Sequence, residues 1–429
     1  MIRHIYLVLI LSIFSLTAWG QFDESFEAMK LASAQEFAEM QDYKEAIKHY
    51  KELRDWYPNK IEYDYQVALC HYRLRDYKQA VKTVHQLVEI NPLEGKYYRL
   101  LGNAYDVMGE YEKGINILNT GLLNLPYNGE LYLDLGIIEM LRGDHERALY
   151  NWERGIKAVP YYPDNYYWVA KTYADSDEKI WSIMYAEMFL NLERGTERFS
   201  EISKLLTDTY LSLIREIPNT GPATNSSNLS TQERLSHAYD WMLKHLNEKG
   251  KITIDEVPDS ILDIKSLPLQ SEMITGVAGS GGPINLNTSD VNIHLNRVRK
   301  NQFEEAYLYV LSILRDNGIL NLNAVSFNQN GSFNELQALH FIRANFIELW
   351  MQLFYQDIPV PLFAWQFEFY DKKMFEAYNY WLLSNGDPDY FIQWQSEHET
   401  EFRFFLETLI ENPLKVDNDN YFVRMEYVK

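Results

Sequence analysis

The chain contains 429 residues, with 40 Lys and Arg against 61 Asp and Glu, so its formal net charge is −21. Its length suggests two or three domains, and its content of 46% apolar and 24% charged residues is typical of a soluble globular protein. The acidity argues against a nucleic-acid-binding protein, because contact with a phosphate backbone requires clustered cations, and against attraction to anionic lipid surfaces. A single cysteine, Cys70, excludes an intramolecular disulfide and a cysteine-rich zinc site.

Residues 1–20 have the features of a secretory signal peptide. Arg3 and His4 form a basic start, an apolar run extends to Phe14, and small residues precede a cleavage point after Gly20. The apolar run is shorter than a membrane span, and no later stretch reaches that length. A short N-terminal membrane anchor is the alternative. We expect an exported, soluble protein, periplasmic or secreted, without an integral membrane segment after cleavage.

The next region has a period of 34 residues. Four prolines are spaced by this interval: Pro58, Pro92, Pro126 and Pro160. Small residues recur in phase at two positions: Ala34, Ala68, Gly102 and Gly136, then Ala46, Ala80, Gly114 and Ala148. The period indicates four structural repeats, which bury their apolar faces by stacking on one another. Their ranges are 27–60, 61–94, 95–128 and 129–162.

This pattern resembles the tetratricopeptide repeat family, and more narrowly its exported bacterial members. The strings Asp42-Tyr43-Lys44-Glu45-Ala46 and Asp76-Tyr77-Lys78-Gln79-Ala80 are typical openings of the second helix in that family. The resemblance implies a helical-hairpin solenoid over residues 22–162, in which the small residues let two helices approach closely. The chain departs from the pattern with His71 and Glu139 at an aromatic position, and with Gly114 and Gly121 at alanine positions.

The remainder of the chain is expected to be mostly helical, so the predicted fold class is all-α, although strands are not excluded in 251–285 or 415–428. We expect single helices over Ile180–Leu192, Leu362–Ser384 and Asp387–Glu411, the first of them amphipathic. The C-terminal region resembles no family. The expected segments are a degenerate repeat with capping helices at 163–217, a linker rich in Pro, Asn, Ser and Thr at 218–230, and a helical C-terminal domain at 231–429 with an irregular loop at 251–285.

Enzyme signatures are missing from the sequence. It contains no hydrolase nucleophile elbow, zinc-protease motif, phosphate-binding loop or dinucleotide fingerprint. The stretch Asp417–Asn420 has alternating oxygen ligands but lacks the glycine and the final glutamate of a calcium loop. We therefore expect no catalytic residue, no metal site and no cofactor.

The tetratricopeptide resemblance implies a binding groove lined by fixed positions of each first helix. Carried over by phase, these positions give the candidate partner-binding residues Gln35, Tyr65, Gln66, Tyr72, Arg73, Lys96, Arg99, Asn103, Tyr167 and Trp168. Arg99 and Asn103 match part of the clamp with which one subfamily binds chaperone tails. Asp134, Asp164 and Trp168 break that clamp, so we do not expect this ligand.

The leading interpretation is a non-catalytic protein–protein interaction scaffold or assembly factor of the cell envelope. It would bind a peptide or a helix of a partner protein in the concave groove, where Tyr and Arg are residue types enriched at interface anchors. The basic cluster of Arg73, Lys96 and Arg99 is the most informative part of this groove in so acidic a chain. A glycan-binding protein with aromatic platforms, an enzyme with a site in 251–429, and a solvated face without a ligand remain alternatives. The sequence does not indicate the oligomeric state.

Overall fold

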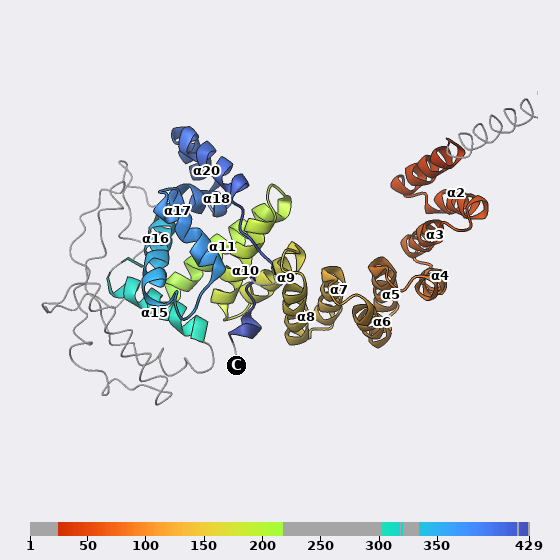
Figure 1. Ribbon diagram of the computed structural model, residues 1–429, viewed down its shortest axis with the longest axis horizontal. Coiled ribbons are helices and arrows are strands. Elements are labelled where there is room, and N and C mark those ends of the chain that lie inside the picture. Colours follow the sequence, from red (N-terminus) through yellow and green to blue (C-terminus); the bar gives the residue numbers. More distant parts are fainter. Residues whose placement is uncertain (1–24, 218–301, 318, 321–333, 418–419, 428–429) are drawn as a thin grey trace, which may run out of the picture. The chain divides into compact units, whose positions relative to one another are not determined.

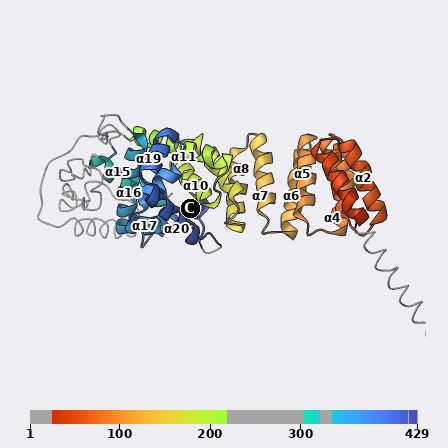
Figure 2. The same cartoon turned by 90° about the horizontal axis from the view of Figure 1, so that it is seen from above.

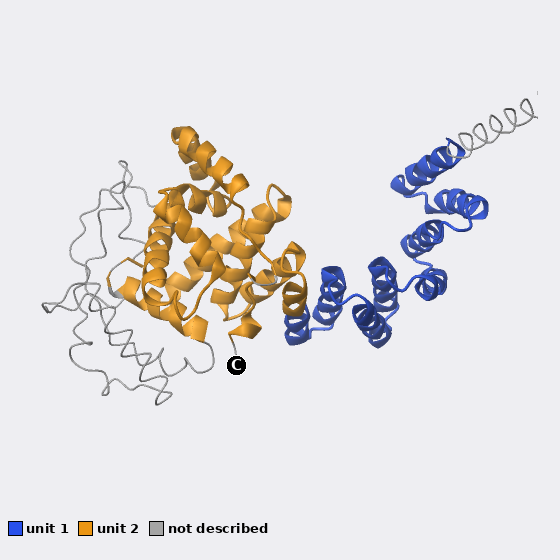
Figure 3. Ribbon diagram, in the orientation of Figure 1, with its two compact units in different colours: residues 1–151 blue, residues 152–429 orange. Residues whose placement is uncertain are grey.

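The structure is a computed structural model that describes residues 25–217, 302–317, 319–320, 334–417 and 420–427 (Figure 1). The predicted signal peptide, the linker and the loop at 251–285 lie outside the described residues. Contacts divide the chain into two compact units, Met1–Asn151 and Trp152–Lys429 (Figure 3).

Unit 1 consists of helices paired in antiparallel hairpins, as the tetratricopeptide resemblance implies. From α2 to α7 each helix packs on its successor, and Figure 2 shows the helices following one another. In chain order the helices are residues 25–39, α2 (Tyr43–Trp56), α3 (Glu62–Arg73), α4 (Tyr77–Ile90), α5 (Gly95–Val107), α6 (Tyr111–Asn124), α7 (Gly129–Leu141) and α8 (His145–Ala158), which crosses into unit 2. The all-α fold class is confirmed for the described residues.

The turn inside each hairpin repeats its backbone geometry every 34 residues. Gln41, Arg75, Gly109 and Gly143 all have a positive φ, between 61° and 79°. Glycine adopts this left-handed conformation at no steric cost. In three of the four hairpins the following residue is an Asp that caps the second helix, as Asp42 does by accepting a hydrogen bond from the Glu45 N–H (3.3 Å); Glu110 of the third hairpin makes no such bond. The sequence motif that begins with Asp therefore marks the point where the second helix begins.

The small residues of the period are the points where paired helices touch. Ala46, Ala80 and Ala148 are fully buried. Where glycine replaces alanine, the packing is closer: a Cβ built on Gly121 would lie 2.7 Å from the ring of Tyr98. Gly121 thus stands where the repeat pattern has alanine because the ring of Tyr98 on α5 occupies the space that an alanine methyl group would need.

Unit 2 contains a further hairpin and a layer of C-terminal helices. Its elements are α9 (Pro163–Ala174), α10 (Lys179–Leu192), α11 (Glu197–Glu216), α15 (Gln302–Asp316), α16 (Glu335–Leu353), α17 (Pro361–Asp371), α18 (Phe375–Leu382), α19 (Pro388–Glu397), α20 (Glu399–Glu411) and the 3-10 helix η3 (Arg424–Glu426). Residues from Ile180 to Asn191 are all buried, so α10 is enclosed on every side. The prediction that this helix is amphipathic was therefore wrong.

Two of the predicted C-terminal helices are each divided in two. The first ends at Asp371, where Lys373 takes a positive φ of 58° and the Met374 N–H donates to the Phe369 carbonyl (2.8 Å). The second is interrupted at His398. Apolar periodicity continues through both breaks, which is why it predicts single helices. The described part of 415–428 forms an isolated bridge between Asp417 and Asn420 and the η3 turn, and no strand.

The end of the described chain packs onto the beginning of unit 2. Phe422 is 1% exposed and contacts the rings of Trp181, Tyr185 and Phe303, with centroids 5.1–6.0 Å apart. The Arg424 N–H donates to the Tyr185 hydroxyl oxygen (2.7 Å). Helices α9 to α11 thus belong to unit 2 together with the C-terminal elements, while the linker predicted at 218–230 lies outside the described residues and stays a prediction.

Candidate partner-binding face

Eight of the ten candidate residues lie in unit 1, and all eight lie on the first helices of its hairpins. Gln35 is on helix 25–39, four candidates are on α3, and three are on α5. Gln35 and Arg73 are exposed, and the other six are half-buried. We call the exposed side of helix 25–39, α3, α5 and α7 the first-helix face. The structure thus assembles these residues on one side of adjacent helices, outside the core.

Lys96 and Tyr65 form one centre of this face. The Lys96 Nζ lies 2.5 Å from a Glu62 carboxylate oxygen and 4.8 Å from the ring centroid of Tyr65. Tyr65 also contacts Tyr97, with ring centroids 5.6 Å apart. Burial raises the pKa of the Tyr65 hydroxyl, and the Glu62 charge adds to the rise. The ion pair with Glu62 thus neutralises the charge of Lys96, and the contact with the Tyr65 ring helps to hold its side chain in place.

Arg99 is held more firmly than Lys96. Its guanidinium donates to both carboxylate oxygens of Asp134, at 2.8 and 3.3 Å, and lies 3.0 Å from Glu130. Asp134 is 4% exposed, and burial raises the pKa of its carboxyl while Arg99 opposes the rise. The predicted basic cluster is accordingly not a free cationic patch, since carboxylates pair with two of its three members.

The third member, Arg73, lies beside Tyr72 at the end of α3. Arg73 is exposed and makes no ion pair within the described part of the chain. Tyr72 packs edge-on against Tyr77, with ring centroids 5.4 Å apart. Burial raises the pKa of the Tyr72 hydroxyl, as do the neighbouring Tyr77 and the charge of Asp106. The buried Oδ1 atom of Asp106 has no hydrogen-bond partner among the described residues. This end of the face therefore offers one exposed cation, Arg73, whereas the Asp106 Oδ1 atom is buried and not open to a partner.

The polar contacts of the first-helix face follow the repeat period. Partners in successive repeats are separated by about one repeat length: Lys60 pairs with Glu27 (33 residues), and Lys96 with Glu62 (34 residues). Arg99 pairs with Asp134, 35 residues away. Stacking repeats brings equivalent positions side by side. The Lys96 and Arg99 pairs connect neighbouring first helices, and the Lys60 pair connects the turn before α3 to helix 25–39.

A hollow of about 800 Å³ lies at the first two repeats. Gln35, Glu39, Lys60, Glu62 and Gln66 line its polar side. The lining also includes the apolar residues Leu31, Ala38 and Ile61. Two predicted amides, Gln35 and Gln66, therefore share one hollow with space for a partner side chain.

The last two candidates, Tyr167 and Trp168, belong to unit 2. Tyr167 is 8% exposed, and its hydroxyl donates to Glu201 (2.7 Å). Lys171 and Arg198 lie over its ring, at 4.9 and 5.3 Å from the centroid. Trp168 is half-buried and stacks on the buried Trp152, with centroids 5.9 Å apart. Tyr167 thus stabilises the junction of α9 and α11, and Trp168 keeps one exposed side.

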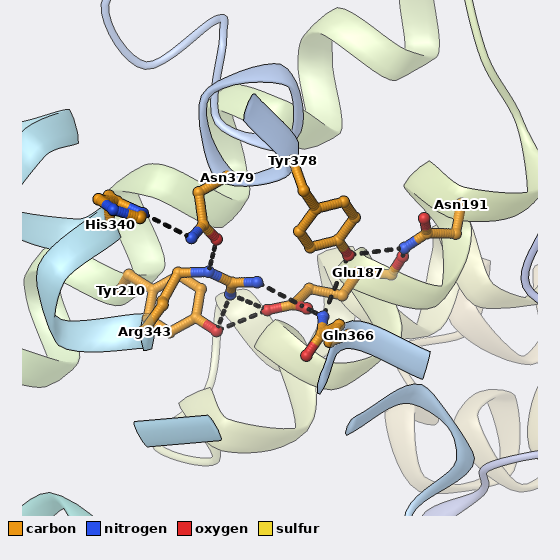
Figure 4. Close-up of polar contacts among 8 residues, drawn as sticks. All are labelled: Glu187, Asn191, Tyr210, His340, Arg343, Gln366, Tyr378 and Asn379. Atoms are coloured by element: carbon orange, nitrogen blue, oxygen red, sulfur yellow. Dashed lines mark hydrogen bonds and ion pairs between the residues drawn. The ribbon is translucent and has the colours of Figure 1, made fainter. Parts of the chain in front are cut away.

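Interior polar chemistry in unit 2 was not predicted from the sequence. The buried pair Glu187–Arg343 joins α10 to α16, with side chains 1% and 4% exposed (Figure 4). Glu187 also accepts hydrogen bonds from Tyr210 on α11 (2.5 Å) and from Gln366 on α17. The Arg343 Nε donates to the Asn379 Oδ1 atom on α18 (2.6 Å).

The same network extends to two further positions. Tyr378 accepts hydrogen bonds from Gln366 (3.0 Å) and Asn191 (3.1 Å). The Asn379 Oδ1 atom accepts from Arg343, so its Nδ2 donates to the His340 Nδ1 (3.0 Å), which assigns a neutral imidazole. Burial, reinforced by the Arg343 charge, lowers the pKa of His340 to about 4. Because its members are buried and mutually bonded, we assign this network to holding five helices together.

The described residues give little support to the two alternative functions, an enzyme and a glycan-binding protein. No group of three or more His, Cys, Asp or Glu among them could hold a metal ion. Trp350, Tyr378, Tyr380 and Trp394 are at most 4% exposed, so these C-terminal aromatics are core and not a sugar platform. In the part of the chain that the structure describes, no helix is sufficiently long and apolar to cross a membrane.

Comparison with known proteins identifies the repeats. The family model described as "Anaphase-promoting complex, cyclosome, subunit 3" matches residues 34–121. Residues 34–121 are tetratricopeptide-type repeats. The resemblance inferred from the 34-residue period is confirmed for this part of the chain, and repeats of this type suggest a protein–protein interaction scaffold. None of the curated proteins matches the chain.

Solved structures that match part of the chain include three proteins. The thermophilic tetratricopeptide protein TTC0263 of Thermus thermophilus is 17% identical, over 42% of this chain and 98% of that one, with a TM-score of 0.35. MamA from Desulfovibrio magneticus is 16% identical over 40% and 97%, with a TM-score of 0.32. PilW, titled a widely conserved type IV pilus biogenesis factor, is 14% identical over 55% and 96%, with a TM-score of 0.36.

Proposed function

We propose that the protein is a non-catalytic interaction scaffold that binds a peptide or a helix of a partner protein on the first-helix face of unit 1. The observation that carries this proposal is the collection of eight polar and aromatic candidates outside the core, on adjacent helices. Two of them, Lys96 and Arg99, are already held in place by ion pairs between repeats, with Glu62 and Asp134. A face ordered before binding loses less conformational entropy when a partner docks.

The proposal places the protein in the cell envelope, exported by the signal peptide at residues 1–20. This part depends on the sequence alone. Fractionation followed by mass spectrometry of the N-terminus tests it. We expect the mature chain to begin at Gln21 in the periplasmic or secreted fraction, whereas a chain that keeps Met1 in the cytoplasm would contradict export.

The test of the binding face uses residues whose replacement leaves the core intact. Cross-linking in the native envelope with mass spectrometry names the partner, and its affinity is then measured for the double variant Arg73→Glu/Asn103→Ala. We expect a loss of about tenfold or more, which corresponds to about 1.4 kcal/mol. Arg99 is left unchanged, because Arg99→Glu would place a second carboxylate against the buried Asp134.

Lys82→Glu is the matched control, since Lys82 is exposed on α4, away from the first-helix face. Binding that is equally strong in the wild type, the double variant and the control would overturn the proposed face. An equal loss of binding in the double variant and the Lys82→Glu control, with the fold of both retained by circular dichroism, would indicate a general charge effect and would also overturn it.

A further inference from the structure

A second surface of unit 1 is independent of the first-helix face. Two consecutive junctions between repeats expose four large apolar side chains: Ile90 (64% exposed) and Leu123 (85%) at the ends of α4 and α6, and Leu93 (65%) and Tyr127 (77%) in the turns that follow. Leu93 and Tyr127 are one period apart, directly after the prolines of their repeats. We call these four residues the turn ridge. Soluble proteins expose single apolar residues routinely, but several together on ordered backbone mark a contact surface.

The two turns are neighbours and are held in place. The buried Tyr98 donates its hydroxyl to the Pro92 carbonyl (3.0 Å) and accepts from the Asn124 amide (2.8 Å), which links one turn to the next. Gly95 lies against the Asn128 side chain, where a Cβ would come within 2.3 Å of the amide nitrogen. These contacts fix the backbone under the exposed side chains, so the ridge needs no ordering on binding.

Charge indicates what kind of partner the ridge fits. Residues 88–95 and 122–129 contain two carboxylates, Glu89 and Glu94, and no lysine or arginine. Neither carboxylate forms an ion pair within the described part of the chain. Elsewhere in unit 1 carboxylates such as Glu62 and Asp134 are neutralised by cations. The ridge is thus an apolar surface with unpaired negative charge beside it.

We propose that the turn ridge binds a protein segment that presents apolar side chains flanked by lysine or arginine, such as one face of a basic amphipathic helix. Such a segment covers the apolar side chains and pairs with Glu89 and Glu94 at the same time. A second copy of this chain is a poorer fit, since it brings the same carboxylates and a net charge of −21. The carboxylates also oppose an anionic lipid surface.

The experiment measures binding of the full chain to two synthetic 15-residue peptides by fluorescence anisotropy. One contains Leu and Lys in amphipathic register, and the other contains Leu and Glu in the same register. We expect the Leu/Lys peptide to bind, and the variant Leu93→Ser/Tyr127→Ser to bind it about tenfold more weakly. The variant Glu89→Gln/Glu94→Gln should bind more weakly at low salt and show a smaller dependence on salt.

Ile392→Ser/Ile410→Ser is the matched control, because these residues of α19 and α20 are exposed to a similar degree, 62% and 72%, and have carboxylates nearby in the sequence, Asp389 and Glu411. We expect its affinity to stay within twofold of the wild type. Equal affinity of wild type and ridge variant, or equal binding of the Leu/Glu peptide, would overturn the proposal. Two further results would overturn the proposal: self-association of the wild type in sedimentation velocity, or its adsorption to phosphatidylcholine vesicles, if the ridge variant abolishes either. Each result would show that the ridge binds a second copy of the chain or a lipid surface instead. Loss of first-helix-face binding in Arg73→Glu/Asn103→Ala leaves these ridge measurements unaffected, so failure of either surface is recognisable separately.

Discussion

Removing the charge of Glu187 tests whether the buried network holds unit 2 together. In Glu187→Gln the side chain keeps its size, but Arg343 remains buried without a carboxylate. The Gln366 side-chain amide, which donates to a Glu187 carboxylate oxygen in the wild type, then faces the amide of the glutamine that replaces Glu187. The backbone and the apolar contacts of α10 stay as they are, so the change isolates the buried charge.

The expected cost follows from the burial of the pair. Side-chain exposures of 1% and 4% mean that water cannot solvate Arg343 when its partner is lost. Breaking a buried ion pair from one side typically costs 3–5 kcal/mol, and we expect about 4 kcal/mol here. The exposed pair Lys171–Glu201 provides the control, because its carboxylate side chain is 46% exposed. Glu201→Gln should cost at most about 1 kcal/mol.

Hydrogen exchange measured by mass spectrometry is the suitable assay, because a chain with two units need not unfold in one step. Peptides from α10 and α16 report the free energy of opening in unit 2, and peptides from α4 and α5 report on unit 1. A loss below about 1 kcal/mol in α10 and α16, or an equal loss in Glu201→Gln, would refute the reasoning. Additive effects of Glu187→Met and Arg343→Met in a double-mutant cycle would refute it as well.

Two further predictions concern single side chains. The pKa of His340 is lowered from 6.5 to about 4, so the stability it contributes is complete above pH 6.5 and is lost as the pH falls through about 4. This amounts to about 3 kcal/mol, and the difference in unfolding free energy between wild type and His340→Gln should change by that amount between pH 7 and pH 4; parallel pH profiles would contradict it. Gly121→Ala should destabilise unit 1 by about 1–3 kcal/mol, because the new methyl overlaps Tyr98, although alanine favours helices. Exposed Asn119→Ala on the same helix is the control, and a thermal melt that Gly121→Ala raises would disprove the clash.

The sequence predicted the hairpins of unit 1 because the repeats share a set of signals in phase, with departures confined to single positions such as Glu110. Small residues such as Ala46 and Ala80 mark where helices touch, and an Asp marks where the second helix begins. Each signal acts within a few residues or between adjacent helices, which is the range over which a sequence pattern is informative. The predicted helices at Leu362–Ser384 and Asp387–Glu411 were wrong in extent. Lys373 and His398 interrupt these helices at points where the apolar pattern continues, so the pattern contains no signal of the breaks.

The candidate face was only partly accessible to sequence reasoning. The period placed Arg73, Lys96 and Arg99 on one side of the repeats, but it could not show which of them would be paired. Asp134 was recognised only as a residue that breaks a clamp, whereas the structure shows it buried beneath Arg99. One further signal was present in the sequence: opposite charges separated by about one period, as in Lys96 and Glu62, predict ion pairs between stacked repeats.

By itself, the sequence determined the repeat, its phase, the start of each second helix and the residues that occupy the first-helix face. These properties depend on local propensity and on the packing of adjacent helices, which recur every 34 residues. Only the tertiary structure decided that α10 is enclosed, that Glu187 meets Arg343, and that Phe422 packs on Trp181. Those contacts join residues 156 to 241 positions apart, and no periodic pattern encodes a pairing that occurs once in the chain.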